Sequence, residues 1–350
     1  MKGVTLSLRL FVLMTVMLAA GAMFAQPYGA WLTNTSGHGY IQLPNSSSLN
    51  FAGGSFTFEA WISMGTTTGC TSLAGNDYLQ SSWIGICEGS IRSYVRGGSS
   101  AYTIGAVPAN DWTHVAVTFD NATKKLSHYV DGELAGERVE PGPITASTAA
   151  WRIWSDPSWT FTPTNSAIDE VRFWNVARTK DQIRATINRE IDAAQAGLVA
   201  VYELDADATD AVGTLHGTKN GASANYLNAA ITGGCSTSTN TLCVGPSGRY
   251  AVSATYKTAS TSGPGKVVAF QTSDSGLFTF FSDSNWEMVV KVLNGCGVNS
   301  RWWVFSSGIT DQHVELVVSD LPHGVTKRYF NYSGQPFNAI TDTSAFATCP

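Results

Sequence analysis

The chain of 350 residues has a net charge of −5 at pH 7, with 43% hydrophobic and only 13% charged residues. This hydrophobic content excludes a disordered chain. The small acidic excess, without a basic stripe, argues against nucleic acid as a partner. Plentiful glycine, serine and threonine between short apolar runs indicate a β-rich extracellular protein and disfavour a helical cytosolic enzyme.

The N-terminus has the layout of a secretory signal peptide. Basic residues precede the apolar run Leu10–Ala20, and small residues offer cleavage after Ala22 or Ala25. We therefore expect residues 1–25 to be removed and the protein to be secreted to the extracellular space or the cell surface. The run is short for a membrane span of about 20 residues. No later apolar stretch is longer, so we expect no membrane span after cleavage.

Period-two alternation predicts strands in the region that follows. Every second residue of Phe56–Ile62 is apolar, so one face of this segment can enter a core. Trp112–Phe119 and Leu126–Val130 form the densest pattern, and the Asp131-Gly132 pair after them suits a tight turn with positive φ. Further strands are expected near residues 40–43, 82–87, 91–96, 151–154, 168–174 and 198–204.

One helix is expected in this region. Thr179 and Gln182 have the spacing of a capping box. Ile183, Ile187 and Ile191 recur every fourth residue and would place one apolar stripe against a sheet.

Residues 233–247 are rich in Ser, Thr, Gly and Asn and predict a linker. Beyond it, short strands recur at intervals of about a dozen residues or less, which is typical of a sandwich of immunoglobulin-like size. The predicted fold class is all-β, with a smaller β-sandwich over residues 248–350. The strands expected in it are 250–256, 267–271, 277–281, 287–292, 301–305, 314–318 and 327–332.

Six cysteines in an exported chain indicate disulfides. Pairing neighbours in the sequence would join Cys70 with Cys87, Cys235 with Cys243, and Cys296 with Cys349. Other pairings, and a mixture of free and paired thiols, remain open. The sequence contains no Cys-x-x-Cys motif that would favour a metal site.

Four segments resemble the laminin-G-like, concanavalin-A-like jelly-roll family, and they occur in the family's order. They are GYIQLPNSSSLNFAGGSFTFEAWI (39–62), the hairpin at 112–132, AIDEVRFWNVARTKDQIRATI (167–187) and GLVAVYELD (197–205). The resemblance implies a jelly roll of two antiparallel sheets over residues 26–232. It also implies binding of carbohydrate or protein partners at the loop rim, often near calcium, and no catalysis in most members.

The second domain resembles a C-terminal module of secreted bacterial proteins of varied architecture. The segment that carries this likeness runs from Thr272 to Asp320. The resemblance implies bacterial export and a β-sandwich, without an assigned activity.

The resemblance also suggests a calcium site. Family members often hold calcium with an acidic residue that Asp169 matches, and with groups of the N-terminal strand that map onto Asn34 and the residues after it. Many members have an acidic pair where this chain has His38-Gly39, which weakens the expected site. Calcium prefers about six to eight oxygen ligands. The alternative is that Asp169 accepts hydrogen bonds from loop amides.

Aromatic residues supply candidate contacts for a sugar ring. Trp159 and Phe161 stand in a loop rich in Pro and Ser, so we expect them to bind ligand. Trp83, Trp151 and Trp154 are further candidates, although Trp151 fits a core strand. His114 and His128 lack other ligands for zinc, so packing inside the sheet is the better interpretation.

The motifs of catalysis are missing from the sequence. Asp131 with Glu133 lies at a turn, and the adjacent side chains of Asp169 and Glu170 diverge, so neither fits the paired acids of a glycan-cleaving jelly roll. We expect an exported bacterial recognition or adhesion protein that is not an enzyme and binds extracellular carbohydrate. The alternatives are a structural or surface-assembly protein with protein partners, and a glycan-cleaving enzyme.

Overall fold

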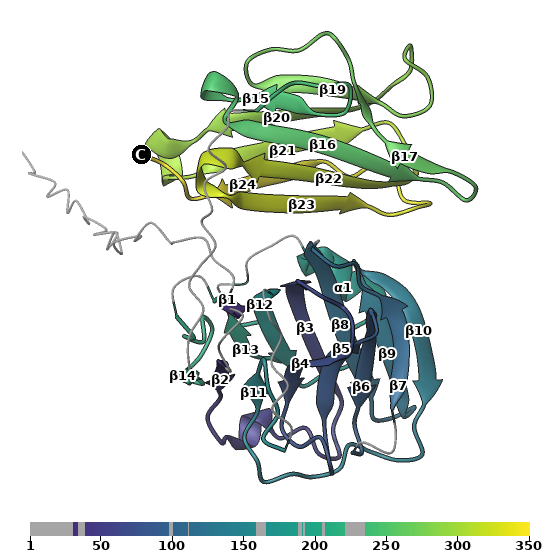
Figure 1. Ribbon diagram of the computed structural model, residues 1–350, viewed down its shortest axis with the longest axis vertical. Helices are drawn as coiled ribbons and strands as arrows, with labels where there is room; N and C mark the ends of the chain where they lie inside the picture. Colours follow the sequence, from purple (N-terminus) through teal and green to yellow (C-terminus); the bar gives the residue numbers. More distant parts are fainter. Residues whose placement is uncertain are drawn as a thin grey trace, which may run out of the picture.

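The computed structural model describes residues 31–33, 39–97, 101–110, 112–158, 166–187, 191, 193–204, 207–220 and 235–350 (Figure 1). It is an all-β protein with four antiparallel sheets, as predicted. Two of the sheets belong to the N-terminal part of the chain and two to the C-terminal part. The two parts form the lower and upper halves of the molecule in Figure 1.

The first domain is a sandwich of two seven-stranded sheets, named here after their central strands. The β3 sheet has the order β1-β12-β3-β8-β9-β10, with β13 paired to β12, and the β4 sheet has the order β14-β2-β11-β4-β5-β6-β7. The strands of the β3 sheet are β1 (Trp31–Thr33), β3 (Phe56–Ser63), β8 (Trp112–Asp120), β9 (Lys125–Val130), β10 (Glu133–Val139), β12 (Ser166–Trp174) and β13 (Leu198–Tyr202). Those of the β4 sheet are β2 (Tyr40–Gln42), β4 (Cys70–Gly75), β5 (Trp83–Cys87), β6 (Ser90–Tyr94), β7 (Tyr102–Ala106), β11 (Arg152–Ile153) and β14 (Thr218–Asn220).

The predicted hairpin lies at the centre of the β3 sheet. β8 pairs along its length with β3 on one side and with β9 on the other. Val115, Val117 and Phe119 are buried in the core between the sheets. Asp131 and Gly132 both have positive φ and join β9 to β10, which confirms the predicted turn.

The helix α1 (Lys180–Thr186) packs on the outer face of the β3 sheet. Its capping box between Thr179 and Gln182 is present, and Ile183 packs against Ala116 and Tyr129. The helix is shorter than the isoleucine spacing predicts. Ile191 is buried instead against Trp174 and Val201, outside any helix, so the sheet edge and not a longer helix accounts for its burial.

The second domain is a sandwich of two five-stranded sheets around its own core. One sheet has the order β15-β16-β22-β23, with β17 paired to β16, and the other has the order β18-β19-β20-β21-β24. The strands are β15 (Leu242–Val244), β16 (Tyr250–Lys257), β17 (Ser262–Pro264), β18 (Lys266–Val267), β19 (Ser275–Thr279), β20 (Trp286–Asn294), β21 (Trp302–Gly308), β22 (His313–Asp320), β23 (Val325–Asn331) and β24 (Ile340–Phe346). A short helix, α2 (Cys296–Asn299), precedes β21.

The predicted linker over residues 233–247 needs a correction. Its last third contains β15, whose Leu242 and Val244 are fully buried in the core of the second domain. These two apolar residues flank Cys243 with the period of a strand. The polar composition around them conceals this short pattern.

Three disulfides join the predicted cysteine pairs. Cys70–Cys87 links directly opposed positions of β4 and β5, Cys235–Cys243 closes the loop before β15, and Cys296–Cys349 ties α2 to the C-terminal end. The structure contains no free cysteine in the part of the chain that it describes. All three bridges lie within single domains, so each stabilises one sandwich.

Candidate functional site

The most chemically distinctive surface is the outer face of the β4 sheet. Ile41, Ile84 and Ile153 point from this sheet into the core, so their neighbours in each strand point outward. The cross-strand register aligns Gln42, Arg152, Gly75, Trp83 and Tyr94 side by side over five strands. We call these five residues the cross-strand row.

Two glycines make space on this face. A Cβ atom at Gly75 would collide with the carboxylate of Asp156, and one at Gly85 would collide with the indole of Trp83. Both side chains therefore lie close against the backbone of the sheet. A larger residue at either position would displace them.

Trp83 lies buried beneath the outer face of the β4 sheet and is not accessible to a ligand. It is fully buried, and its Nε1 donates to Ser72 Oγ at 2.7 Å. Tyr78 and Tyr94 pack against it with ring centroids 5.8 and 5.3 Å away. Trp151 and Trp154 are also buried. None of these three predicted tryptophan candidates can therefore stack on a ligand.

The accessible polar groups lie at one end of the row. The Arg152 guanidinium sits 4.4 Å above the centroid of the Tyr40 ring, and its Nε donates to Gln42 Oε1 at 3.0 Å. All three side chains are half-buried. They form a fixed combination of an aromatic ring, an amide and a cation, with the rotamers held by mutual contact.

Asp156 lies between this end of the row and Trp83. Its Oδ2 accepts a hydrogen bond from the Tyr78 amide at 3.0 Å, and its Oδ1 accepts one from the Ser158 amide at 2.7 Å. Burial raises the pKa of Asp156 to about 6, and the nearby Asp77 carboxylate adds to this rise. The buried carboxyl group joins two loops, because backbone amides occupy both of its oxygens.

A small cavity opens at the loop rim beside the row. Its volume is about 220 Å³, and side chains and backbone of three loop segments line it. Asn76 and Trp151 connect it to the row, since they directly follow Gly75 and precede Arg152. The other lining residues are mostly Asn, Ser, Thr and Ala: Pro44, Asn45, Ser46, Ser47, Leu49, Asn50, Ser147, Thr148, Ala149 and Ala150.

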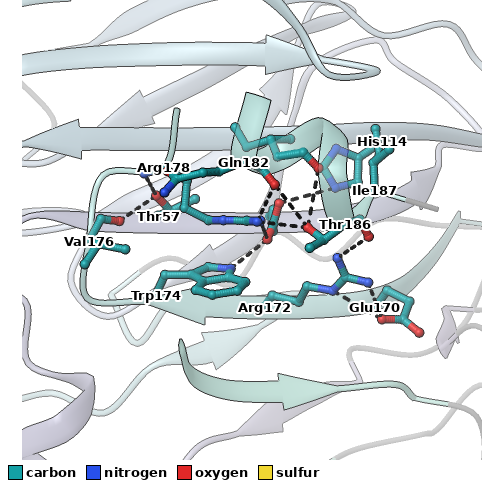
Figure 2. Close-up of polar contacts among 12 residues, drawn as sticks. Thr57, His114, Glu170, Arg172, Trp174, Val176, Arg178, Gln182, Thr186 and Ile187 are labelled. Atoms are coloured by element: carbon teal, nitrogen blue, oxygen red, sulfur yellow. Dashed lines mark hydrogen bonds and ion pairs between the residues drawn. The ribbon is translucent and has the colours of Figure 1, made fainter. Parts of the chain in front are cut away.

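A second polar cluster lies behind α1, on the opposite sheet (Figure 2). Buried Glu59 accepts a hydrogen bond from Trp174 Nε1 at 2.6 Å and pairs with Arg178, whose guanidinium also reaches Thr186 of the helix. Arg172 joins the same helix through the Thr186 carbonyl at 3.0 Å. These contacts hold α1 on the sheet, so we interpret the cluster as structural.

Both predicted packing histidines are buried in the first domain. His114 Nε2 lies 3.7 Å from Glu59 Oε2, and burial lowers the His114 pKa well below its ordinary value. His128 contacts Ser93 and the Ile104 carbonyl. No group of three or more His, Cys, Asp or Glu side chains that could hold a metal occurs among the described residues.

Of the two predicted calcium ligands, the structure describes only Asp169. Asp169 Oδ1 accepts a hydrogen bond from the Glu170 amide at 2.9 Å, and Asn34 lies outside the described residues. Thr33, the residue before Asn34, pairs with Ser166, so the antiparallel β1 runs away from Asp169. The calcium site therefore stays a prediction, with Asp169 as its one described ligand.

Trp159 and Phe161, the predicted ligand contacts, also lie outside the described residues. The sequence interpretation did not single out Tyr40, Gln42 or Arg152. Their only local signal is that they flank the apolar Ile41 and Ile153. No helix long and apolar enough to cross a membrane occurs among the described residues.

Residues 35–184 match a laminin G family described as the concanavalin A-like lectin/glucanases superfamily. This segment, about two fifths of the chain, is similar to that superfamily. The match includes β2 to β12, and therefore the whole cross-strand row and the described loops beside it. A comparison with curated proteins gave no match.

Several solved structures are similar to the first domain. A candidate carbohydrate-binding protein from Bacteroides ovatus has 24% identity and a TM-score of 0.48, over 58% of this chain and 61% of that one. The CBM40 module of a Ruminococcus gnavus IT-sialidase, bound to α2,3-sialyllactose, has 14% identity and a TM-score of 0.37, over 46% and 97%. A heptameric SAP-like pentraxin from Limulus polyphemus has 12% identity and a TM-score of 0.30, over 41% and 79%. The chain thus spans about three fifths of the length of the Bacteroides protein.

Proposed function

We propose that this chain is an exported, non-catalytic protein that binds carbohydrate on the outer face of the β4 sheet. The observation that carries the proposal is the accessible group of Tyr40, Gln42 and Arg152 at the end of the cross-strand row. Its members come from two neighbouring strands and hold one another in place. A saccharide needs such a combination, because its hydroxyl groups require donors and acceptors while its ring faces are apolar.

The superfamily description supports this proposal, since it names lectins and glucanases. Between these two kinds of protein, the acids on the face favour binding without cleavage. A retaining glycosidase needs two carboxyl groups about 5–5.5 Å apart that both reach the substrate. Asp156 is fully buried, and its two oxygens already accept backbone amides.

Export is supported by the three disulfides together with the signal-like N-terminus. Disulfides persist in oxidising compartments and are rare in the cytosol. Each of the two domains contains at least one bridge. We therefore place the protein outside the cytoplasm, in the extracellular space or on the cell surface.

We also propose that the loop after Ser158 contributes to binding through Trp159 and Phe161. Asp156 accepts the Ser158 amide and so anchors the start of this loop beside the row. A Trp159→Ala variant should weaken binding without lowering the melting temperature of the protein. If it binds as tightly as the parent protein, the loop has no part in recognition.

The experiment is a glycan array with the full chain, followed by calorimetry on the best ligand. Tyr40→Ala and Gln42→Ala should each weaken binding by about tenfold, as expected for one lost polar or stacking contact. Leu134→Ala is the matched control, because Leu134 is 44% exposed on β10 of the other sheet. An array without any bound glycan would overturn the proposal.

A surface-assembly role is the second candidate, and the second domain carries the observation that favours it. Phe281 and Ile309 are 52% and 82% exposed and line one cavity of about 480 Å³. Exposed apolar side chains around a depression are typical of protein-binding surfaces. A Phe281→Ala, Ile309→Ala double variant should lose any self-association that sedimentation detects, while glycan binding stays unchanged.

A further inference from the structure

We infer that the ligand of the outer face is an anionic saccharide, whose carboxylate or sulfate groups are bound by Arg152 and Arg92. This inference rests on the proposed carbohydrate function and names the class of ligand. It follows from where the two arginines lie, from their bonding, and from their spacing.

Both arginines lie on the same outer face. Arg152 belongs to the cross-strand row, and Arg92 lies on β6, opposite Gly85 and next to Thr103 of β7. Both are half-buried. The contacts between the two domains come from Trp61, Gly132 and Arg184, which belong to the opposite sheet, its turn and α1. These contacts of the described residues all lie on the other side of the first domain from the β4 sheet.

Neither arginine forms an ion pair with a described residue. Arg92 donates from Nε to Thr103 Oγ1 at 2.7 Å and from Nη1 toward Cys70 Sγ at 3.7 Å. Arg152 donates from Nε to Gln42 and from Nη1 to the Asp156 carbonyl at 3.4 Å. The Nη2 of Arg152 has no hydrogen-bond partner among the described residues, whereas Arg92 also interacts with the Tyr94 hydroxyl group. A guanidinium presents five donors in a planar fork that matches a carboxylate or sulfate.

The more deeply buried arginines are bonded differently, whereas Arg96 and Arg301 also donate to backbone carbonyls without an ion pair to a described residue. Arg172, Arg178 and Arg249 are at least as buried, and each pairs with a carboxylate. A chain with a net charge of −5 has acids available for such pairing. Two half-buried cations on one face, neither of them in an ion pair with a described residue, are therefore suited to an anion from outside.

The carboxylates near this face form no ion pair with these arginines, although the charge of Arg152 opposes the rise in the Asp156 pKa. Asp156 is turned toward the amides of Tyr78 and Ser158, and Asp77 accepts the amides of Leu79 and Gln80. Both acids thus belong to the loops above the row.

The spacing of the arginines favours a polymer with repeated charges. Arg152 on β11 and Arg92 on β6 are three strand positions apart in the sheet. Neighbouring strands lie about 4.8 Å apart, so the two positions are separated by roughly 14 Å across the sheet. A single anion cannot reach both. A saccharide chain that crosses the strands and carries a charge on each successive unit can contact both arginines.

The test compares three oligosaccharides of equal length on the full chain by calorimetry at low salt. They are an oligogalacturonate, a heparin-derived oligosaccharide and a neutral cellulose-derived one, so that the two anionic probes distinguish carboxylate from sulfate. At least one anionic probe should bind about tenfold or more tightly than the neutral probe, and added salt should weaken it.

Variants test whether the two arginines cause the preference for an anionic oligosaccharide. Arg152→Gln and Arg92→Gln should each weaken binding of the anionic probe by about tenfold or more. Arg152→Lys keeps the charge but loses the planar fork of donors, so it should weaken binding of the anionic probe by less than Arg152→Gln. It replaces Arg152→Gln as the test if that variant does not fold. Arg301→Gln makes the same charge change on the second domain and should have no effect.

The outcomes separate this inference from the proposed function. Equal or tighter binding of the neutral probe, with both Gln variants unchanged, overturns the anionic class while carbohydrate binding stands. Binding of no saccharide at all overturns both.

Discussion

The indole of Trp61 on β3 lies parallel to the ring of Phe330 on β23, with centroids 6.2 Å apart and planes inclined by 13°. This stack joins the two domains. Beside it, the Arg184 guanidinium of α1 sits 3.6 Å above the ring of Tyr332. The domains therefore meet through aromatic rings of the second sandwich against one sheet and helix of the first. In Figure 1, β23 is the strand of the upper domain that lies nearest to the lower one.

Removing one ring should uncouple the domains without unfolding either core. A stacked aromatic pair contributes about 0.5–1.5 kcal/mol beyond its buried area. We expect Phe330→Ala to make the region between the domains more sensitive to proteolysis and to separate two transitions in calorimetry. The matched control is Phe270→Ala in the same domain, where the ring is 69% exposed. Identical proteolysis of both variants would contradict a docked arrangement.

Glu59 should be the most sensitive polar position of the first domain. It is fully buried and pairs with Arg178 and Trp174. Removing one partner of a buried pair leaves the other charge uncompensated, which costs about 3–5 kcal/mol. Glu59→Gln should therefore lower the free energy of unfolding by an amount of this order in urea titrations.

An exposed ion pair gives the control for Glu59. Lys125 and Glu137 pair at 2.9 Å, with side chains 41% and 40% exposed. Exposed pairs contribute about 0–1 kcal/mol. Glu137→Gln should thus change stability little. Equal effects of the two substitutions would mean that burial does not determine the role of Glu59.

The sequence predicts those parts of the fold that depend on neighbours in the chain. The alternation in Phe56–Ile62 and in Trp112–Phe119 marks β3 and β8, and the close cysteine pairs match the disulfides. β11 contains only Arg152 and Ile153, and it is a strand because distant β2 and β4 flank it. A segment this short has no periodicity to detect.

The residues of the candidate site also form no pattern that the sequence alone would reveal. Arg92 and Arg152 are isolated cations sixty positions apart in the sequence. Only the register through β4 and β5 places them on one face. Trp83 carried the stronger signal in the sequence, but the glycine at position 85 lets it lie flat and become buried. Residue type alone could not distinguish the floor of the face from its contact groups.

His128 should make the first domain sensitive to acid. The Ile104 carbonyl can only accept, so Nδ1 carries the proton and Nε2 accepts from the Ser93 hydroxyl at 2.7 Å. Burial lowers the His128 pKa to about 4 from its ordinary 6.5. The unfolded chain therefore binds the proton more tightly, and stability falls as the pH drops from about 6.5 to about 4.

The size of this effect is limited to about 3 kcal/mol by the difference in pKa. Asp156 acts in the opposite direction, because its raised pKa lets the folded protein bind a proton first between pH 6 and its ordinary value of 3.8. The measurement must therefore isolate His128. Its ring proton should titrate in NMR with a midpoint near 4, and His128→Phe should reduce the slope of unfolding free energy against pH. A midpoint near 6.5 would contradict the burial argument.

The calcium hypothesis predicts a metal-dependent stability that passes through Asp169. A ligand that binds only the folded state stabilises it by about 2.7 kcal/mol at a hundredfold excess over its dissociation constant. A chelator should then lower the melting temperature of the first domain, and Asp169→Ala should remove that difference. Glu137→Ala, which deletes an exposed acid of the same domain, should keep it. In the antiparallel register, Trp31 at the start of β1 lies opposite Ile168, the residue before Asp169. If the chelator leaves the melting temperature unchanged and Asp169→Ala melts like the parent protein, the calcium hypothesis is wrong.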